Sequence, residues 1–256
     1  MSDMLLPEAL ADYDPCKVFK AEAGCIQGIP FEALMLCRQQ FHMVSQPATQ
    51  DVHENIDQLS GLTLWEGAKD LLMFLNTDKE FVAQAVVGKR VVEIGCGLGL
   101  PGVVAMRKGA QLVDFQDISE QVLRQAAVPH VVSNSPRAVA VQPRFIGGTW
   151  KDCRNRFFAE GTQYDTVICS EGCYKEELYA ELVDLLLTVL PAPRLPDVPA
   201  GVALFSGKRY YFGCGGGTTS FALYAQGRGF ETRVVKAIED GKSNVREIIE
   251  LKRLPE

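Results

Sequence analysis

The chain has 256 residues and a formal net charge of −6 at pH 7. This length suffices for a substantial core in one large α/β domain, with or without an N-terminal extension. An acidic balance argues against a broad basic surface for nucleic-acid phosphates, so we expect no direct nucleic-acid contact. Acidic residues stand where a secretory signal has positive charge, and no apolar run reaches the roughly 18 residues of a membrane helix. We therefore expect a soluble protein of the cytoplasm or nucleus, without membrane contact.

The eight cysteines are expected to be reduced thiols in such a protein. No metal site is expected, because the gaps between the candidate ligands are too wide for a zinc knuckle in the group Cys16, Cys25, Cys37 and His42. Cys169 and Cys173 have no adjacent histidine that would support nucleophilic catalysis. No histidine of this chain is assigned to catalysis.

The first 60 residues are expected to form an N-terminal extension that is partly disordered or ordered on the core, ahead of a main domain over 61–256. Glycines, prolines and acids dominate this extension, and only 31–41 has helical spacing. Apolar residues then recur every three to four positions over Thr63–Leu75. This spacing predicts an amphipathic helix packed on the main domain.

The run R-V-V-E-I-G-C-G-L-G-L-P-G at 90–102 is the most informative segment. It predicts a buried strand over Arg90–Ile94 that leads into closely spaced glycines, where the backbone can approach a ligand. Asp117 ends the next apolar run and is placed to accept hydrogen bonds from ribose hydroxyls. The glycine spacing differs from the dinucleotide fingerprint, and no phosphate-binding lysine is present. The loop therefore favours S-adenosylmethionine as cofactor over a phosphorylated nucleotide, against the simpler alternative of an ordinary strand-to-helix turn.

Strands and helices are expected to alternate along the rest of the chain. Further strands are predicted at 112–116, 138–141, 166–169 and 202–205, with helices at 176–190 and 220–226. Two alternating runs at 232–238 and 245–251 predict a terminal hairpin. This order indicates an α/β fold with a mostly parallel sheet and one reversed edge strand.

Several motifs together resemble the histidine protein methyltransferase family of the seven-β-strand S-adenosylmethionine methyltransferases. The similar segments are L-W-E-G-A-K-D-L-L at 64–72, F-Q-D at 115–117, V-P-H-V-V-S-N-S at 128–135, S-E-G-C-Y at 170–174 and K-R-Y-Y-F-G-C-G-G-G at 208–217. The resemblance covers the chain from about Gln58 onward. It implies a Rossmann-like, seven-stranded, mostly parallel sheet with helices on both faces and an antiparallel C-terminal hairpin. One departure is Thr149, which stands where the wider group often has an acid near the adenine.

Site residues follow from the loop and from these motifs. For cofactor binding we expect Trp65, Glu93, Gly95, Cys96, Gly97, Gly99, Asp117, Trp150 and Ser170. Glu171 and Tyr174 are expected to be catalytic, because a histidine nucleophile needs an acceptor for the proton on its other ring nitrogen. Substrate binding, by a lid that closes on a peptide, is assigned to Tyr210, Tyr211, Phe212, Gly215, Gly216 and Gly217. For Trp65, Trp150 and Tyr174 the simpler alternative is core packing, for Glu171 a helix N-terminal charge, and for 207–217 a surface loop.

The resemblance also implies the kind of partner. A monomeric enzyme with an acidic surface would suit a basic protein substrate, and in family terms a ribosomal protein. Two alternatives stay open. One is a protein-lysine methyltransferase of the wider group, and the other is a cofactor-binding assembly or interaction module without turnover.

Overall fold

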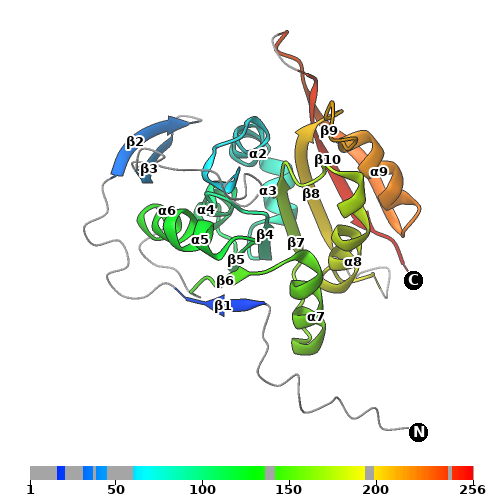
Figure 1. Ribbon diagram of the computed structural model, residues 1–256, viewed down its shortest axis with the longest axis horizontal. Helices are drawn as coiled ribbons and strands as arrows, with labels where there is room; N and C mark the ends of the chain where they lie inside the picture. The colour runs from blue at the N-terminus through cyan, green and yellow to red at the C-terminus, as the bar shows by residue number, and fades with distance from the viewer. Residues whose placement is uncertain are drawn as a thin grey trace, which may run out of the picture.

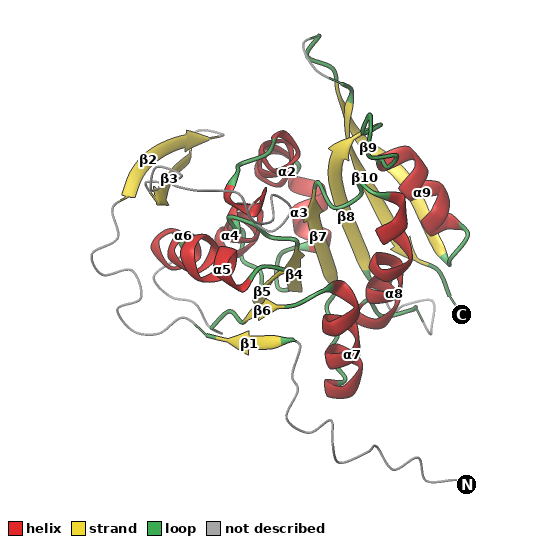
Figure 2. Ribbon diagram, viewed as in Figure 1, coloured by secondary structure: helices red, strands yellow, loops and turns green. Residues whose placement is uncertain are grey.

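The computed structural model describes residues 16–20, 31–36, 39–44, 60–135, 142–193, 199–241 and 244–255. Its centre is an eight-stranded sheet in the order β1-β6-β5-β4-β7-β8-β10-β9, with helices on both faces (Figures 1 and 2). A separate two-stranded sheet, β2-β3, lies beside α6. The alternating α/β architecture expected from the sequence is therefore confirmed.

Five parallel strands form the middle of the sheet: β6 (Phe145–Gly147), β5 (Leu112–Asp117), β4 (Arg90–Ile94), β7 (Thr166–Ser170) and β8 (Val202–Lys208). Four of them match predicted strands to within a few residues at their ends. The strand expected at 138–141 lies outside the described residues. The position next to β5 is taken by β6.

The C-terminal hairpin consists of β9 (Phe230–Ile238) and β10 (Arg246–Arg253). Because β10 is antiparallel to both β8 and β9, the reversed strand lies inside the sheet and β9 forms the edge. The expectation of a reversed strand at the edge was wrong in this respect. The burial of β10 explains the order, because Ile248 and Ile249 face the two opposite cores and each is 1% exposed.

Helices cover each face of the sheet and create two apolar cores (Figure 2). One face carries α2 (Glu66–Thr77), α3 (Lys79–Ala85), α4 (Leu100–Arg107), α5 (Glu120–Val122), the π-helical turn η3 (Leu123–Ala127) and α6 (Val128–Asn134). The other face carries α7 (Trp150–Glu160), α8 (Tyr179–Val189) and α9 (Thr218–Gln226). Two short 3-10 turns precede α2 and α8, namely η2 (Ser60–Leu62) and η4 (Glu176–Leu178). Among the described residues, no helix combines the length and apolarity needed to cross a membrane.

Successive residues of a central strand serve the two cores in turn, as the period of two requires. Val91 packs in the core under α2 to α6, and its neighbour Val92 packs in the core under α7 to α9. Both side chains are fully buried. The two adjacent valines of this strand are therefore explained by burial on both faces.

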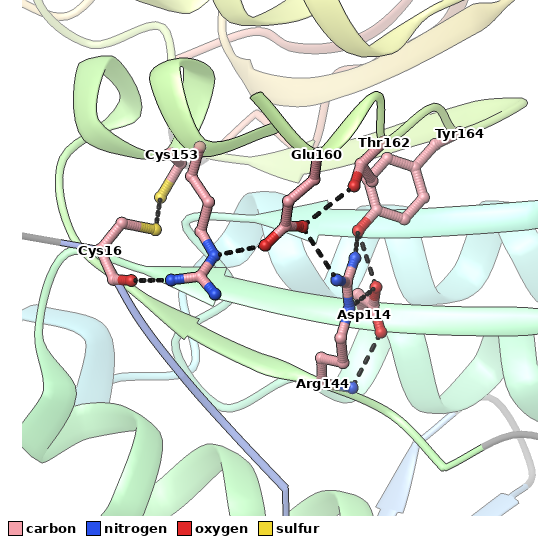
Figure 3. A network of polar contacts seen from close by, with 8 residues as sticks. Cys16, Asp114, Arg144, Cys153, Glu160, Thr162 and Tyr164 are labelled. Atoms are coloured by element: carbon pink, nitrogen blue, oxygen red, sulfur yellow. Dashed lines mark hydrogen bonds and ion pairs between the residues drawn. The ribbon is translucent and has the colours of Figure 1, made fainter. Parts of the chain in front are cut away.

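A short strand from the N-terminal region, β1 (Lys17–Phe19), adds an eighth strand antiparallel to β6 (Figure 1). Just before it, the Sγ atom of Cys16 lies 3.4 Å from the Sγ atom of Cys153 in α7 (Figure 3). Both thiols are buried. The sheet is therefore wider than the seven strands that the resemblance implied.

A buried carboxylate near the β1 edge of the sheet pairs with an arginine that also contacts a second carboxylate (Figure 3). Asp114 of β5 is fully buried and accepts hydrogen bonds from the Nε of Arg144 at 2.9 Å and from the hydroxyl of Tyr164 at 2.7 Å. Arg144 also contacts Glu160 at 3.3 Å. Although burial disfavours the charged guanidinium, Asp114 and Tyr164 raise the pKa of Arg144. The ion pair satisfies groups that would otherwise be costly to bury.

The segment with helical spacing at 31–41 forms strands instead, so that prediction was wrong. β2 (Phe31–Leu36) and β3 (Gln39–Val44) pair antiparallel, with Phe31 opposite Val44. Phe41 is fully buried, and the guanidinium of Arg107 lies 4.6 Å from its ring centroid. A short apolar run does not distinguish helix from strand by its spacing, and tertiary contacts decide here.

Two side chains of α6 hold β3 in place by hydrogen bonding to its backbone. The Asn134 side chain accepts from the amide of His42 at 2.7 Å and donates to the carbonyl of His42 at 2.8 Å. Nε2 of His130 accepts from the amide of Val44 at 2.9 Å. This last bond requires an unprotonated Nε2, and burial of the ring lowers the pKa of His130 to about 4.

The His130 contact predicts that acid weakens the fold. An unfolded histidine has a pKa near 6.5, whereas burial lowers the pKa of His130 to about 4 in the folded protein. Between these two values the unfolded chain binds a proton that the folded protein does not, so the free energy of unfolding decreases as the pH is lowered. From pH 7.5 to 5.5 the loss should be about 1 kcal/mol. Urea unfolding at both pH values measures it. His130→Gln keeps an acceptor without a titrating group, so its loss should be smaller by that amount; equal losses in the two proteins would contradict the assignment.

Candidate functional site

The loop between β4 and α4 is held open by a carboxylate from the neighbouring strand. Gly97 has a φ of 50°, and its amide donates to Oδ2 of Asp117 at 2.9 Å. A Cβ atom at Gly97 would lie only 2.8 Å from the carbonyl oxygen of Gly61. Glycine is needed here because the backbone both adopts a left-handed conformation and approaches the turn η2 closely.

Asp117 has further backbone partners. Its Oδ1 accepts from the amide of Ser119 at 3.0 Å, and the residue is 6% exposed. Burial raises the pKa of Asp117, while hydrogen bonds from backbone amides, including those of Ser119 and Gly97, oppose the rise. Each carboxylate oxygen can accept more than one hydrogen bond. Asp117 can therefore brace the loop and still accept from a ligand.

Glu93 lies below the loop, away from the cavity. It is fully buried, and its Oε2 accepts from the amide of Gly102 at 2.7 Å, in the first turn of α4. Burial raises the pKa of Glu93 well above its ordinary value, the Gly102 amide opposes the rise, and the charge of Asp117 adds to it. The expected direct contact of Glu93 with the cofactor is not supported by this placement, because Glu93 does not line the cavity.

The loop forms one wall of a cavity of about 380 Å³ at the carboxyl ends of the parallel strands, where ligands of such sheets bind. The loop and the first turn of α4 contribute the segment Gly95–Pro101, in which Gly99 alone is not in the lining. Asp117 and Ile118 follow β5, and Thr149 and Trp150 follow β6. The rest of the lining comes from η2 through the first turn of α2, and from the end of β7 through the first turn of α8: Ser60, Gly61, Thr63, Leu64, Trp65, Ala68, Ser170, Glu171, Gly172, Tyr174, Leu178 and Glu181.

Glu171 enters this cavity from a constrained backbone. It has a φ of 58°, a left-handed conformation that costs free energy for a residue with a Cβ. Its Oε1 accepts from the amide of Gly67 at 2.7 Å, in the first turn of α2, and its Oε2 accepts from the hydroxyl of Tyr211. A Cβ at Gly67 would lie 2.5 Å from Oε1, so glycine permits the contact. The carboxylate thus occupies the positive end of α2.

Tyr211 fixes the other side of that carboxylate. Its hydroxyl also accepts from the amide of Lys208 at 3.0 Å, so the group is bound from two directions. Burial, followed by the charge of Glu171, raises the pKa of Tyr211. The phenol therefore stays protonated and donates to Glu171 at neutral pH.

The aromatic and glycine segment 210–217 packs beside the cavity and does not line it. Its backbone pairs with the segment after β7, because the amide of Gly216 donates to the carbonyl of Tyr174 at 3.1 Å. A Cβ at Gly216 would lie 2.4 Å from the carbonyl carbon of Tyr174. Tyr210 and Phe212 are 53% and 83% exposed. The segment is docked at its glycine end and presents two exposed aromatic rings at its tip.

The two tryptophans lie at the starts of α2 and α7. Trp65 is 47% exposed, and its Nε1 donates to the carbonyl of Ser60 at 3.0 Å. Trp150 is partly buried against the core under α7 to α9. Thr149 caps α7 by accepting from the amide of Asp152 at 3.1 Å, while its hydroxyl donates to the Asp152 carboxylate at 2.6 Å. Thr149 is thus engaged in a capping box.

Nine of the expected site residues meet in this one cavity: Trp65, Gly95, Cys96, Gly97, Asp117, Trp150, Ser170, Glu171 and Tyr174. The others lie outside the lining, namely Glu93, Gly99, Tyr210, Tyr211, Phe212, Gly215, Gly216 and Gly217. Sequence reasoning missed Gly61, Ile118, Leu178 and Glu181, which also line it. Ile118 follows Asp117 directly and could have been found, whereas Gly61 and Glu181 reach the cavity only through tertiary packing.

Residues 45–194 match the family model described as Lysine methyltransferase. A Histidine protein methyltransferase 1 homolog from Bos taurus is 32% identical over 206 residues, which cover 71% of this chain and 52% of that protein. A Protein N-lysine methyltransferase METTL21A from Danio rerio is 32% identical over 123 residues, covering 48% of this chain and 52% of that protein. The chain spans about half the length of these curated relatives.

A solved structure extends the likeness in fold. The magnesium protoporphyrin IX methyltransferase from Synechocystis PCC 6803, solved with bound S-adenosylmethionine, has a TM-score of 0.52 and 18% identity. The alignment covers 79% of this chain and 86% of that one. At this identity the likeness concerns the fold alone.

The close packing of α4 on β5 predicts that Gly102 tolerates no side chain. A Cβ there would lie 2.3 Å from Cε1 of Phe115 and 2.7 Å from Oε2 of Glu93. Gly102→Ala should lower the free energy of unfolding by about 1–3 kcal/mol, as overpacking of a core does. Gly227 is the matched control, because a Cβ there has no neighbour closer than 3.5 Å. Chemical denaturation tests this; equal stability of the two variants would contradict the packing argument.

Proposed function

This chain belongs to the lysine methyltransferase family, and from that premise we propose that it transfers a methyl group from S-adenosylmethionine to a histidine side chain of a protein. One observation carries the proposal. The glycine loop and Asp117 share a single cavity with Glu171 and Tyr174. Groups suited to a nucleoside and groups suited to a reacting side chain therefore lie within reach of one bound ligand.

The residues present fit the cofactor. Asp117 offers carboxylate oxygens for the ribose hydroxyls, and Gly97 lets the loop backbone line the cavity while it packs on Gly61. Trp65 and Trp150 supply apolar walls with ring faces. S-adenosylmethionine supplies a methyl group already activated by a sulfonium. The chain's contribution is then to bind and align, and to exclude water from the reacting atoms.

A histidine acceptor suits the part of the cavity lined by Glu171. A neutral imidazole has a lone pair on one nitrogen and a proton on the other. A carboxylate that accepts the N–H of the non-reacting nitrogen would fix the tautomer and aim the lone pair at the methyl carbon. Glu171 is held in place by Gly67 and Tyr211, and its oxygens retain capacity for one such hydrogen bond. After transfer the imidazolium is stabilised by the same carboxylate until it loses its proton.

The substrate we propose is a basic protein, and in family terms a ribosomal one. The net charge of −6 supports this choice through charge complementarity. Tyr210 and Phe212, exposed at the tip of the segment beside Tyr174, offer apolar contacts for a peptide. We propose that this segment binds substrate without closing as a lid, because its backbone is already paired with the segment after β7.

A lysine acceptor is the second candidate, favoured by the description of the family model and by the relative from Danio rerio. The two acceptors differ in their protonation. A lysine amine has a pKa near 10.4 and must lose a proton before it attacks, whereas an imidazole is mostly neutral above about pH 7. Histidine transfer should therefore level off above neutral pH, and lysine transfer should keep rising.

Identification of the labelled product tests the proposal. The protein is incubated with methyl-labelled S-adenosylmethionine and a lysate of cells that lack it, and the proteins are then hydrolysed to amino acids. Methylhistidine should carry the label, and Gly97→Val, whose side chain would clash with the carbonyl of Gly61 and distort the loop, should abolish it. Methyllysine as the only labelled product would reject the histidine acceptor. Binding of S-adenosylmethionine without any labelled product would favour an interaction module.

A further inference from the structure

Glu181 is a carboxylate in the cavity wall that makes no hydrogen bond or ion pair with the part of the chain that the structure describes. Two nearby carboxylates, one on α8 and one on α7, already have polar partners. Asp184 of α8 pairs with Arg154 at 3.3 Å and with Arg228 at 2.7 Å. Asp152 of α7 is part of the capping box. An uncommitted charged group facing a cavity is placed to recognise a ligand.

The rotation of α8 determines which side of the cavity Glu181 occupies. Tyr179 packs on the rings of Phe221 at 5.1 Å and Tyr224 at 5.8 Å, both in α9. At about 100° per residue, Glu181 lies about 200° further around the helix, on the side opposite α9. On that side α8 packs against α7, because Asp184, three residues after Glu181, pairs with Arg154 of α7. Glu181 therefore faces the start of α7.

The alignment of the two helices brings Glu181 level with Trp150. Both α7 and α8 connect parallel strands, so they run in the same direction. The Arg154–Asp184 ion pair joins them at one level. One turn toward the two N-termini are Trp150, four residues before Arg154, and Glu181, three residues before Asp184. Both line the cavity.

This end of the cavity corresponds to the base of the cofactor, a step that rests on the proposed function. If Asp117 of β5 holds the ribose, the adenine lies on the side of β6, whose following residues are Thr149 and Trp150. Adenine carries an exocyclic amine that needs an acceptor. The Thr149 hydroxyl is already bonded to Asp152 in both directions.

We propose that Glu181 accepts a hydrogen bond from the exocyclic amine of the adenine. The contact selects adenine over bases that carry a carbonyl at the same position, because a carboxylate repels a carbonyl oxygen. Glu181 is then a determinant of cofactor specificity on α8, a different element from the loop after β6.

Calorimetric titration with two ligands tests the assignment. S-adenosylhomocysteine carries the amine, and S-inosylhomocysteine carries a carbonyl in its place. The wild-type protein should bind the first more tightly. Glu181→Ala should weaken S-adenosylhomocysteine binding about tenfold, as expected for loss of a charge-assisted hydrogen bond, and should not weaken binding of S-inosylhomocysteine. Glu177→Ala is the control, because Glu177 is exposed and lies outside the cavity lining.

The other outcomes contradict specific statements. An equal loss for both ligands would make Glu181 structural, and unchanged affinities with a raised KM for the protein substrate would make it a substrate contact; each overturns the assignment. Failure of the wild-type protein to bind S-adenosylhomocysteine would contradict the proposed function and this assignment with it. Binding by the wild-type protein with an unaffected Glu181→Ala variant would contradict only the role of Glu181.

Discussion

A carboxylate that accepts the amide of a glycine is the interaction on which this site depends. It occurs three times at the carboxyl edge of the sheet: Glu93 with Gly102, Asp117 with Gly97, and Glu171 with Gly67. In each case glycine is required, because a Cβ would meet the carboxylate or a neighbouring backbone atom at less than 3 Å. These pairs join β4 to α4, β5 to the glycine loop, and the segment after β7 to α2. Each pair also places carboxylate oxygens against backbone dipoles that favour negative charge there.

The three carboxylates differ in whether they can still accept a hydrogen bond from a ligand in the cavity. Glu93 is fully buried and outside the cavity, so its role is to hold α4 against the strand it follows. Asp117 and Glu171 line the cavity and keep acceptor capacity beyond their backbone partners. Glu171 also holds a left-handed backbone conformation, a strain that the surrounding bonds from Gly67 and Tyr211 must offset. Structural bracing and ligand binding are thus carried by the same side chains.

Sequence periodicity identified the parts of the fold whose pattern is local. The buried strand at Arg90–Ile94 and its glycine loop were predictable because apolar residues and glycines have few alternative explanations there. The hairpin over 31–44 was not, because its strands are held by Asn134 and His130, about 90 residues further along. Glu181 was missed for a similar reason. Its position in the wall depends on the rotation of α8 and on packing against α7, neither of which leaves a motif.

The most direct test of this account is methyl transfer by Glu171→Gln. Glutamine keeps an acceptor for the Gly67 amide and a partner for Tyr211, so the fold and S-adenosylhomocysteine affinity should be preserved while the charge is lost. Label incorporated into methylhistidine should fall at least about tenfold, equivalent to about 1.4 kcal/mol in the barrier. Glu177→Gln, an exposed neighbour, should transfer at the wild-type rate. Undiminished transfer by a folded Glu171→Gln protein would contradict the role assigned to this carboxylate.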